Sequence, residues 1–408
     1  MNKRQFLKST LGLSLAPSLA KLLAQPAAAD DELYWAQIRK AYRIKPDYIN
    51  LENGYYNILP EATLEKHIQH IRDVNYQGAY YMRTTQFPDR KAMSKLVAEV
   101  VHCSPDDLIL TRNTTESLDM IIGGFPWQAG DEAVFAIQDY GAMQDMFEQV
   151  ARRQGIVLKK VSLPLHPTND DEIVELYANA ITHKTKLLMV CHMVNVTGQI
   201  LPIRKICDMA HAKGVEVMVD GAHAVAHIEF NLPDLACDYY GASLHKWLAV
   251  PLGVGMLYVK PEHVKKIWPV FAENESAVKG IERLNHLGTN PVHAHLAIQD
   301  SVEFYRQLGP ARKEARLRYL QQYWTKQVRN LPGIILNTPE EPKRHGAIAN
   351  VGVAKLKPAE LAKRLLNEFK IYTVAIDGNG VHGCRITPNV FTSTVELDQL
   401  VRALKALA

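Results

Sequence analysis

The sequence predicts an α/β fold in which a largely parallel sheet forms a large domain and a smaller α+β domain follows it. Three observations support this prediction. Short apolar, β-branched segments such as 215–219 alternate with helix-length segments between residues 107 and 259, at the spacing of βαβ units. A carboxylate, Asp220, directly follows one of these segments, and open α/β sheets place their ligands at such carboxyl ends. Beyond Pro310 the pattern changes to long charged helices and short strands.

The predicted elements of the first three quarters of the chain follow in order. Residues 30–45 and 60–74 are expected to be helices, the second opened by Pro60. A short strand near residue 50 runs into a turn at Gly54 between them. Gly214 ends the helix predicted at 202–213. Further helices are expected at 91–101, 113–122, 170–181 and 292–307, and strands at 107–112, 132–137, 155–161, 186–193, 215–219 and 255–259.

The smaller domain is predicted from a long charged helix that runs from residue 310 to about 330. Short strands are expected near 334, at 348–353 and at 371–375, with a helix at 358–369. The chain is therefore divided into an N-terminal leader at 1–29, an N-terminal arm at 30–60, a large domain at 61–309 and a small C-terminal domain at 310–408.

Two polar motifs lie 20 residues apart in the middle of the large domain. Asp220-Gly-Ala-His223 follows one apolar segment, and Ser243-Leu-His245-Lys246-Trp247 follows the next. Pyridoxal phosphate (PLP) chemistry needs a lysine amine that bonds to the cofactor aldehyde and a carboxylate that keeps the pyridine nitrogen protonated. The alternative is that Asp220 caps a helix and Lys246 is a solvated charge.

These motifs resemble those of the class V aminotransferase family, which has PLP fold type I. The resemblance extends from about Asn50 to the C-terminus, and the Asp-Gly-Ala-His motif is most similar to the isopenicillin N epimerase branch. It implies a mainly parallel seven-stranded sheet, PLP bonded to Lys246, and Asp220 on the pyridine nitrogen. It also implies that His223 lies near the phenolic oxygen of PLP.

The start of the helix predicted at 113–122 is the expected phosphate site. A helix N-terminus presents free N–H groups, and the hydroxyls of Thr114 and Thr115 add donors. The resemblance adds Ser243 and His245 to the phosphate site. It also implies that Tyr140 stacks on the ring and that Asn195 lies near the phenolic oxygen, whereas the alternatives are a helix-capping tyrosine and a turn-forming asparagine.

The expected substrate contacts come from three segments. Arg385, in Cys-Arg-Ile-Thr-Pro-Asn, resembles the family's arginine for the substrate α-carboxylate, and its planar fork suits two parallel hydrogen bonds. Tyr55 and Tyr56 are candidates for the substrate pocket, with aromatic packing in the arm as the alternative. Arg83 is a candidate for contact with substrate or a partner subunit, with a solvated arginine as the alternative.

The same resemblance implies a homodimer with shared active sites. Residues 287–291 resemble the family's Gly-Thr loop, in which Thr289 reaches the phosphate of the neighbouring subunit. An ordinary turn before the helix at 292–307 is the alternative.

The residues alone do not choose among transamination, epimerisation and lyase chemistry on an amino acid or aminoacyl peptide. Cysteine desulfurases of the family carry a nucleophilic cysteine ahead of the substrate arginine, and residues 373–383 contain none. Cys384 resembles a structural cysteine, so desulfurase or selenocysteine lyase chemistry is disfavoured. A periplasmic PLP enzyme that modifies a glutamyl side chain in siderophore maturation remains an alternative. A non-catalytic binding protein on this fold is a further alternative, and the presence of both Asp220 and Lys246 argues against it.

Composition excludes several other classes. A net charge of +4 on 408 residues gives no reason to expect nucleic acid. The five cysteines include no CxxC pair, so neither a disulfide framework nor a metal site is predicted.

The N-terminus is typical of an export signal. Lys3-Arg4-Gln-Phe-Leu-Lys resembles a twin-arginine motif with Lys3 in place of the first arginine. An apolar stretch at 11–23 and Ala27-Ala-Ala29 before Asp30 complete the pattern. The sequence predicts a periplasmic protein without membrane association after processing. The alternative is an amphipathic helix in a cytoplasmic protein.

Overall fold

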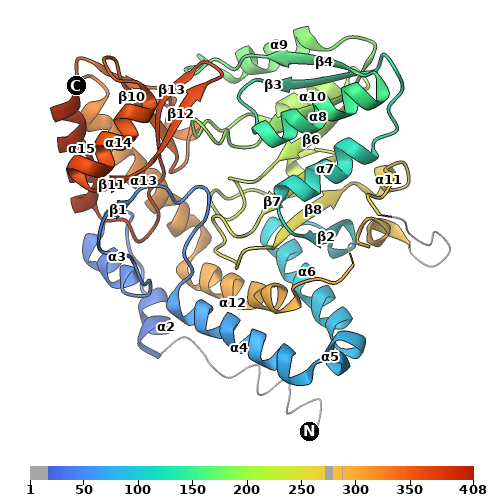
Figure 1. The fold of residues 1–408 in the computed structure, drawn as a ribbon, viewed down its shortest axis with the longest axis horizontal. Helices are drawn as coiled ribbons and strands as arrows, with labels where there is room; N and C mark the ends of the chain where they lie inside the picture. The colour runs from blue at the N-terminus through green and yellow to red at the C-terminus, as the bar shows by residue number, and fades with distance from the viewer. Residues whose placement is uncertain (1–16, 272–278, 287) are drawn as a thin grey trace.

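The computed structural model describes residues 17–271, 279–286 and 288–408. The basic start of the predicted export signal and Leu287 of the predicted Gly-Thr loop lie outside these residues. Seven strands form the large sheet, in the order β4-β3-β5-β6-β7-β8-β2 (Figure 1). They are β2 (Leu108–Thr111), β3 (Glu132–Ala136), β4 (Val157–Val161), β5 (Thr185–Cys191), β6 (Glu216–Asp220), β7 (Tyr239–Ser243) and β8 (Gly255–Val259).

Most of this sheet is parallel, which confirms the predicted fold class. Neighbours from β4 to β7 pair in parallel, and β8 runs antiparallel to both β7 and β2. The chain order reverses between β3 and β5, because β4 lies outside β3 and β6 lies on the other side of β5. Such a reversal opens a crevice at the carboxyl ends of the strands.

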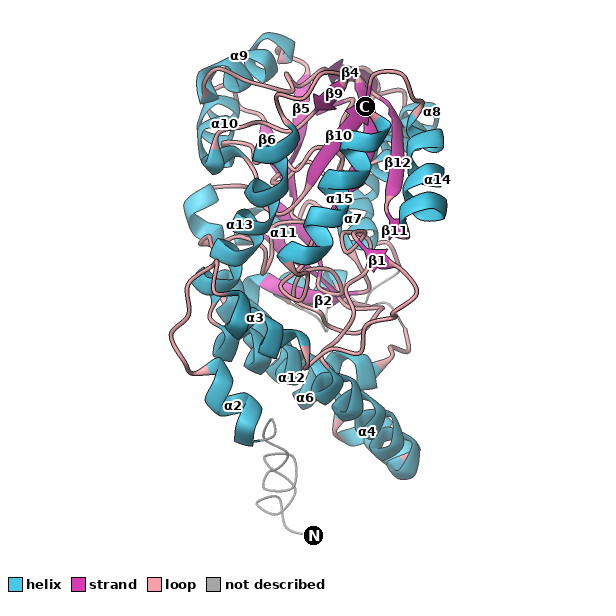
Figure 2. Ribbon diagram, turned by 90° about the vertical axis from the view of Figure 1, so that its left-hand side faces the viewer, coloured by secondary structure: helices cyan, strands magenta, loops and turns pink. Residues whose placement is uncertain are grey.

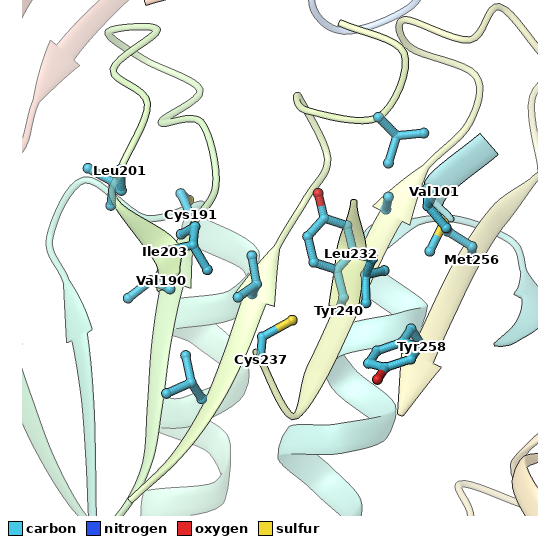
Figure 3. Close-up of a cluster of buried hydrophobic side chains, with 14 of the residues drawn as sticks. Val101, Val190, Cys191, Leu201, Ile203, Leu232, Cys237, Tyr240, Met256 and Tyr258 are labelled. Atoms are coloured by element: carbon cyan, nitrogen blue, oxygen red, sulfur yellow. The ribbon is translucent and has the colours of Figure 1, made fainter. Parts of the chain in front are cut away.

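Helices cover both faces of the sheet, so successive strand residues face two different cores (Figure 2). In β6, Val217 and Val219 belong to one core, while Met218 belongs to the other. Figure 3 shows part of the first core, where Tyr240 packs near Cys237 and Leu232. That core is covered by α6 (Gln86–Val101), α9 (Asp170–Ala180), α10 (Ile203–His211) and α12 (Val292–Leu308), and the second by α7 (Thr114–Gly124) and α8 (Gly141–Gln154).

The C-terminal residues fold around a four-stranded antiparallel sheet in the order β12-β13-β10-β9. Leu320, Trp324, Leu361 and Leu400 pack on it from three helices. The strands are β9 (Ile334–Leu336), β10 (Ala349–Val353), β12 (Val374–Gly378) and β13 (Val381–Ile386), and the helices are α13 (Pro310–Val328), α14 (Pro358–Phe369) and α15 (Thr394–Leu407).

The N-terminal segment crosses to this smaller sheet domain (Figure 1). Strand β1 (Ile49–Asn50) pairs in parallel with β11 (Ile371–Tyr372), and a single bridge joins Glu52 to Thr387. These pairings place residues 52–55 beside the end of β13. The remaining helices are α2 (Pro17–Leu23), α3 (Glu32–Arg39), α4 (Glu61–Gln77), α5 (Ala79–Thr84) and α11 (Pro261–Val264).

The sequence patterns predicted no bounds for α2, α5, α8, α11, α15 or β13. The hairpin that contains β13 has a clear sequence signal, the Asn379-Gly380 dipeptide of a two-residue turn. Both residues have positive φ, as such a turn requires. The helix expected at 30–45 is shorter, because Asp31 caps its start by accepting from the Tyr34 amide at 3.1 Å and the helix already ends at Arg39. Within the described residues, every helix is too short or too polar to span a bilayer.

Candidate active site

A cavity of about 250 Å³ lies at the carboxyl ends of β5, β6 and β7. The N-terminal segment and β13 close it from the side of the smaller sheet. Eleven of the residues proposed from the sequence line it: Tyr55, Thr114, Thr115, Tyr140, Asn195, Asp220, His223, Ser243, His245, Lys246 and Arg385.

Lys246 lies just beyond β7, with its amine facing the His223 ring. Lys246 Nζ is 3.2 Å from His223 Nε2, and the Trp247 indole donates to His223 Nδ1 at 3.2 Å. Removal from water lowers the pKa of the Lys246 amine to about 8, although the Asp220 charge opposes this effect. The lowered pKa therefore increases the fraction of this amine that is neutral, and nucleophilic, near neutral pH.

The ring nitrogens of His223 have defined roles. An indole N–H can only donate, so Nδ1 of His223 accepts and the proton of the neutral ring is on Nε2. Burial, with smaller contributions from Lys246 and Arg385, lowers the His223 pKa and keeps the ring neutral. His223 therefore directs an N–H group at the lysine amine, which favours its uncharged form.

Asp220 ends β6 and is 4% exposed, so its carboxylate is buried. Its Oδ1 accepts a hydrogen bond from the Ala222 amide at 2.9 Å. Desolvation raises the carboxyl pKa, and the Ala222 amide and the Lys246 charge counteract this increase. A protonated pyridine nitrogen beside this carboxylate would further favour its ionised form.

The first turn of α7 meets the end of β7 at the cavity wall. The Thr114 amide donates to Ser243 Oγ at 2.9 Å, and the two side-chain hydroxyls are 2.7 Å apart. Asn113 caps the helix by accepting from the Glu116 amide. Thr115 also lines the cavity, so two hydroxyls and the positive end of the helix dipole could hold a phosphate there.

Three further cavity residues have features that a bound cofactor would satisfy. Tyr140 is 42% exposed at the start of α8, and its side chain makes no capping hydrogen bond. Asn195 Oδ1 and His245 Nδ1 are buried without a hydrogen-bond partner among the described residues. Buried polar atoms normally have a partner, and a polar ligand could provide one.

Arg385 has a partner that the sequence analysis did not foresee. Its Nη2 and Nε donate to the two carboxylate oxygens of Glu52 at 2.5 and 3.2 Å, and its Nη1 donates to the Asn195 carbonyl at 3.2 Å. Both charged side chains are nearly buried. The sequence signal for Glu52 was its position directly after a predicted strand, in Asn-Leu-Glu-Asn-Gly. Asp220 has the same kind of position.

Three residues proposed from the sequence do not line the cavity. Tyr56 is half-buried beside the exposed Tyr55, so only Tyr55 reaches the cavity. Arg83 is exposed on α5, and Thr289 is exposed before α12. Within one chain neither residue contributes to the site. Cys191, at the end of β5, does line it, although sequence reasoning did not identify it.

The residues present fit PLP. Lys246 offers a nucleophilic amine, Asp220 a buried carboxylate and the start of α7 a phosphate site, all on one cavity. The unpartnered Asn195 and His245 atoms show that the cavity wall is built for a polar group. The fold and this site together define a PLP-dependent enzyme of fold type I.

The chain belongs to the class-V aminotransferase family, whose model matches residues 60–403. It is 29% identical to isopenicillin N epimerase from Streptomyces clavuligerus over 91% of this chain and 98% of that protein. A probable cysteine desulfurase from a Synechocystis strain is 27% identical over 80% of this chain and 82% of the relative. These findings confirm the predicted family and the PLP cofactor.

Solved structures confirm the fold. The apo cysteine desulfurase from Thermococcus onnurineus NA1 has a TM-score of 0.81 at 20% identity, covering 94% of this chain and 99% of that one. A C-DES mutant with glycine covalently linked to its PLP cofactor has the same TM-score and identity, covering 91% and 99%.

Proposed function

We propose that this PLP enzyme acts at the α-carbon of an amino acid or aminoacyl peptide, by chemistry similar to that of isopenicillin N epimerase. The observation that carries this proposal is the Lys246 amine, whose pKa is lowered to about 8 and whose Nζ lies 3.2 Å from a neutral His223. A group with a pKa near the working pH can both accept and return a proton.

The residues of the chain divide the task. Bound PLP supplies an aldehyde for covalent attachment and an electron-withdrawing ring. Asp220 would hold a proton on the ring nitrogen, and Thr114, Thr115 and Ser243, which line the same cavity, would hold the phosphate. The Lys246 amine, when not bonded to the cofactor, would remove the α-proton of the substrate, and His223, whose Nε2 is 3.2 Å from Nζ, would orient that amine. Return of a proton to the other face of the α-carbon requires a second proton donor, whereas return to the same face gives only exchange of the α-proton with solvent.

Direct detection of α-proton chemistry tests the proposal. The holoenzyme is incubated in D2O with a panel of free amino acids and short peptides, and deuterium incorporation and chirality are followed by NMR and chiral chromatography. We expect exchange with at least one compound, lost in Lys246→Ala. Borohydride reduction should attach a pyridoxyl group to Lys246. Labelling of a different lysine would refute the assignment.

Cysteine desulfuration is disfavoured by the placement of two cysteines. Cys384 is fully buried in the core of the smaller sheet, and desolvation raises its thiol pKa to about 12. Cys191 reaches the cavity, but burial and the nearby Asp139 and Asp220 raise its pKa as well. Neither provides the exposed thiolate that a sulfur-accepting nucleophile needs.

We further propose that the chain is exported and that the mature protein begins near Asp30. The basic start, the apolar stretch and Ala27-Ala-Ala29 support this proposal. Export would also be consistent with modification of a glutamyl side chain during siderophore maturation in the periplasm, which remains the second candidate. Mass spectrometry of the protein from its native host tests export, because uncleaved protein found only in the cytoplasm would contradict it.

A further inference from the structure

The carboxylate of Glu52 occupies the fork of Arg385 at the wall of the cavity. The two hydrogen bonds, at 2.5 and 3.2 Å, join both oxygens of Glu52 to two nitrogens of one guanidinium. This is the paired geometry with which arginine binds a free carboxylate ligand. Glu52 is 9% and Arg385 is 7% exposed, so little water reaches the pair.

The surrounding backbone holds Glu52 in this position. The Tyr55 amide donates to Glu52 Oε1 at 3.0 Å, and the amides of Asn53 and Gly54 donate to Thr387 Oγ1 at 2.7 and 3.1 Å. Thr387 is two residues beyond Arg385. The turn that carries Glu52 is therefore attached to the same strand end that carries its partner.

The pair changes what the cavity attracts. An unpaired Arg385 would present a desolvated positive charge to a substrate carboxylate, whereas the Glu52 charge cancels it. A substrate carboxylate must therefore replace Glu52 on the guanidinium. The displaced Glu52 charge then keeps only a weaker partner, the Tyr55 amide. Removal of a partner from a buried ion pair is costly. An amine without a carboxylate faces no such competition.

We propose that Glu52 is a specificity-determining residue that competes with the substrate α-carboxylate for Arg385. It makes free α-amino acids weak ligands, and it favours substrates whose other contacts, as in a peptide, offset the displacement of Glu52. This inference rests on the proposed function, in that an amine substrate binds in the cavity beside Lys246.

The test compares two probes that differ only in the carboxylate. L-Alanine and ethylamine are titrated by calorimetry into the PLP-loaded wild type, Glu52→Gln and Glu52→Asp. We expect Glu52→Gln to bind L-alanine at least about tenfold more tightly than wild type, a change of about 1.4 kcal/mol. Glu52→Asp should bind it about threefold more tightly, because the shorter carboxylate reaches Arg385 less well. Binding of ethylamine should change less than about twofold in both.

A matched control is the Arg39–Glu396 pair, which also joins the N-terminal segment to the C-terminal domain through two hydrogen bonds, at 2.7 and 2.8 Å, away from the cavity. Glu396→Gln should bind L-alanine as wild type does. If both Glu52 variants retain PLP and bind L-alanine no more tightly than wild type, the inference is wrong. Failure of the proposed function is distinct, since it would appear as no pyridoxyl label on Lys246 and no α-proton exchange with any compound.

Discussion

The Trp247 indole donates a hydrogen bond of 3.2 Å to Nδ1 of the His223 ring, and this bond determines which ring nitrogen carries the proton. Because the indole donates, His223 directs Nε2–H at the Lys246 amine and disfavours its ammonium form. Adjacent residues of the motif thus have complementary places in the proposed site, since Lys246 is the proposed reactive group and Trp247 holds the histidine that faces it.

Trp247→Phe should raise the pKa of the Lys246 amine. Without the indole N–H, the His223 ring can place its lone pair toward Lys246 and accept from the ammonium form. Covalent attachment of PLP to apoenzyme needs the neutral amine, so its rate rises with pH through the amine pKa of about 8 in the wild type. We expect that midpoint to move upward by about half a pH unit. Rapid-mixing absorbance measurements across pH 6–10 would detect this change.

The control for this experiment is Trp324→Phe. Trp324 is equally buried, but it lies in the core of the smaller sheet, and its indole nitrogen has no hydrogen-bond partner among the described residues. Trp324→Phe should lower the free energy of unfolding without moving the pH midpoint of PLP attachment. Equal midpoints in wild type and Trp247→Phe would mean that the tautomer does not control Lys246.

Asp238, at the amino end of β7, should be the main stabilising carboxylate of the large sheet. It is 2% exposed and accepts from the Val217 amide at 2.7 Å, His211 at 2.7 Å, Lys260 at 2.9 Å and His263 at 3.1 Å. These donors lower its pKa despite burial. Asp238→Asn should therefore decrease the free energy of unfolding by about 3 kcal/mol at pH 7, as measured by urea denaturation.

The pH dependence gives this prediction its sign. A carboxyl group with a lowered folded-state pKa stabilises the fold above its unfolded pKa of about 4, and that contribution is lost as the pH falls further. The difference between wild type and Asp238→Asn should therefore shrink below pH 4. The exposed Asp234, changed to Asn, should have little effect at any pH. A difference for Asp238→Asn that is independent of pH would indicate a packing defect rather than a lost charge.

The centre of the site was predictable because its signals are local. Asp220 and Lys246 each follow a short apolar strand, and parallel neighbours bring their ends together. The Glu52–Arg385 pair was not predictable in this way, because its members are 333 residues apart. They meet only because the two-residue strands β1 and β11 pair, and such short strands have almost no sequence signal. The predicted roles of Arg83 and Thr289 depend on a second chain, so they remain predictions.

Cys384→Ser should leave native turnover largely unchanged. The thiol lies in the core of the smaller sheet and donates weakly to the Pro358 carbonyl at 3.6 Å, so it does not reach the substrate. We expect kcat within about twofold and a modest loss of stability, about 1 kcal/mol. Sulfide release from cysteine that is robust in the wild type and absent in this variant would overturn the assignment of Cys384 as structural.

Dimer formation is tested at exposed aromatic side chains. Tyr76 and Tyr80, on α4 and α5, are 91% and 71% exposed, and Trp268 beyond α11 is 68% exposed. Large exposed aromatics are typical of surfaces that a partner covers. Tyr76→Glu with Tyr80→Glu should reduce the mass measured by light scattering to about half that of the wild type. Leu33→Glu, at a residue 81% exposed on α3, is the control. A monomeric wild type would contradict the shared active site.

The last prediction concerns the charge of Asp220. Asp220→Asn keeps the side-chain shape and the Ala222 contact but removes the carboxylate that would hold a proton on the pyridine nitrogen of bound PLP. The ring then withdraws fewer electrons, so negative charge at the substrate α-carbon is less stable. Attachment of PLP to Lys246 does not need that charge and should persist. We expect α-proton exchange in D2O to slow by about a hundredfold, equivalent to about 2.7 kcal/mol of transition-state stabilisation.

Asp139 provides the matched control for this variant. It is also a buried carboxylate near the end of a strand, with a pKa raised to about 7 by desolvation, but it does not line the cavity. Asp139→Asn should therefore slow exchange far less than Asp220→Asn when both retain PLP. If the two variants slowed exchange equally, the loss would reflect the buried strand ends in general, and Asp220 would have no special relation to the cofactor ring. If Asp220→Asn exchanged the α-proton at the wild-type rate, Asp220 would be excluded as the partner of the pyridine nitrogen.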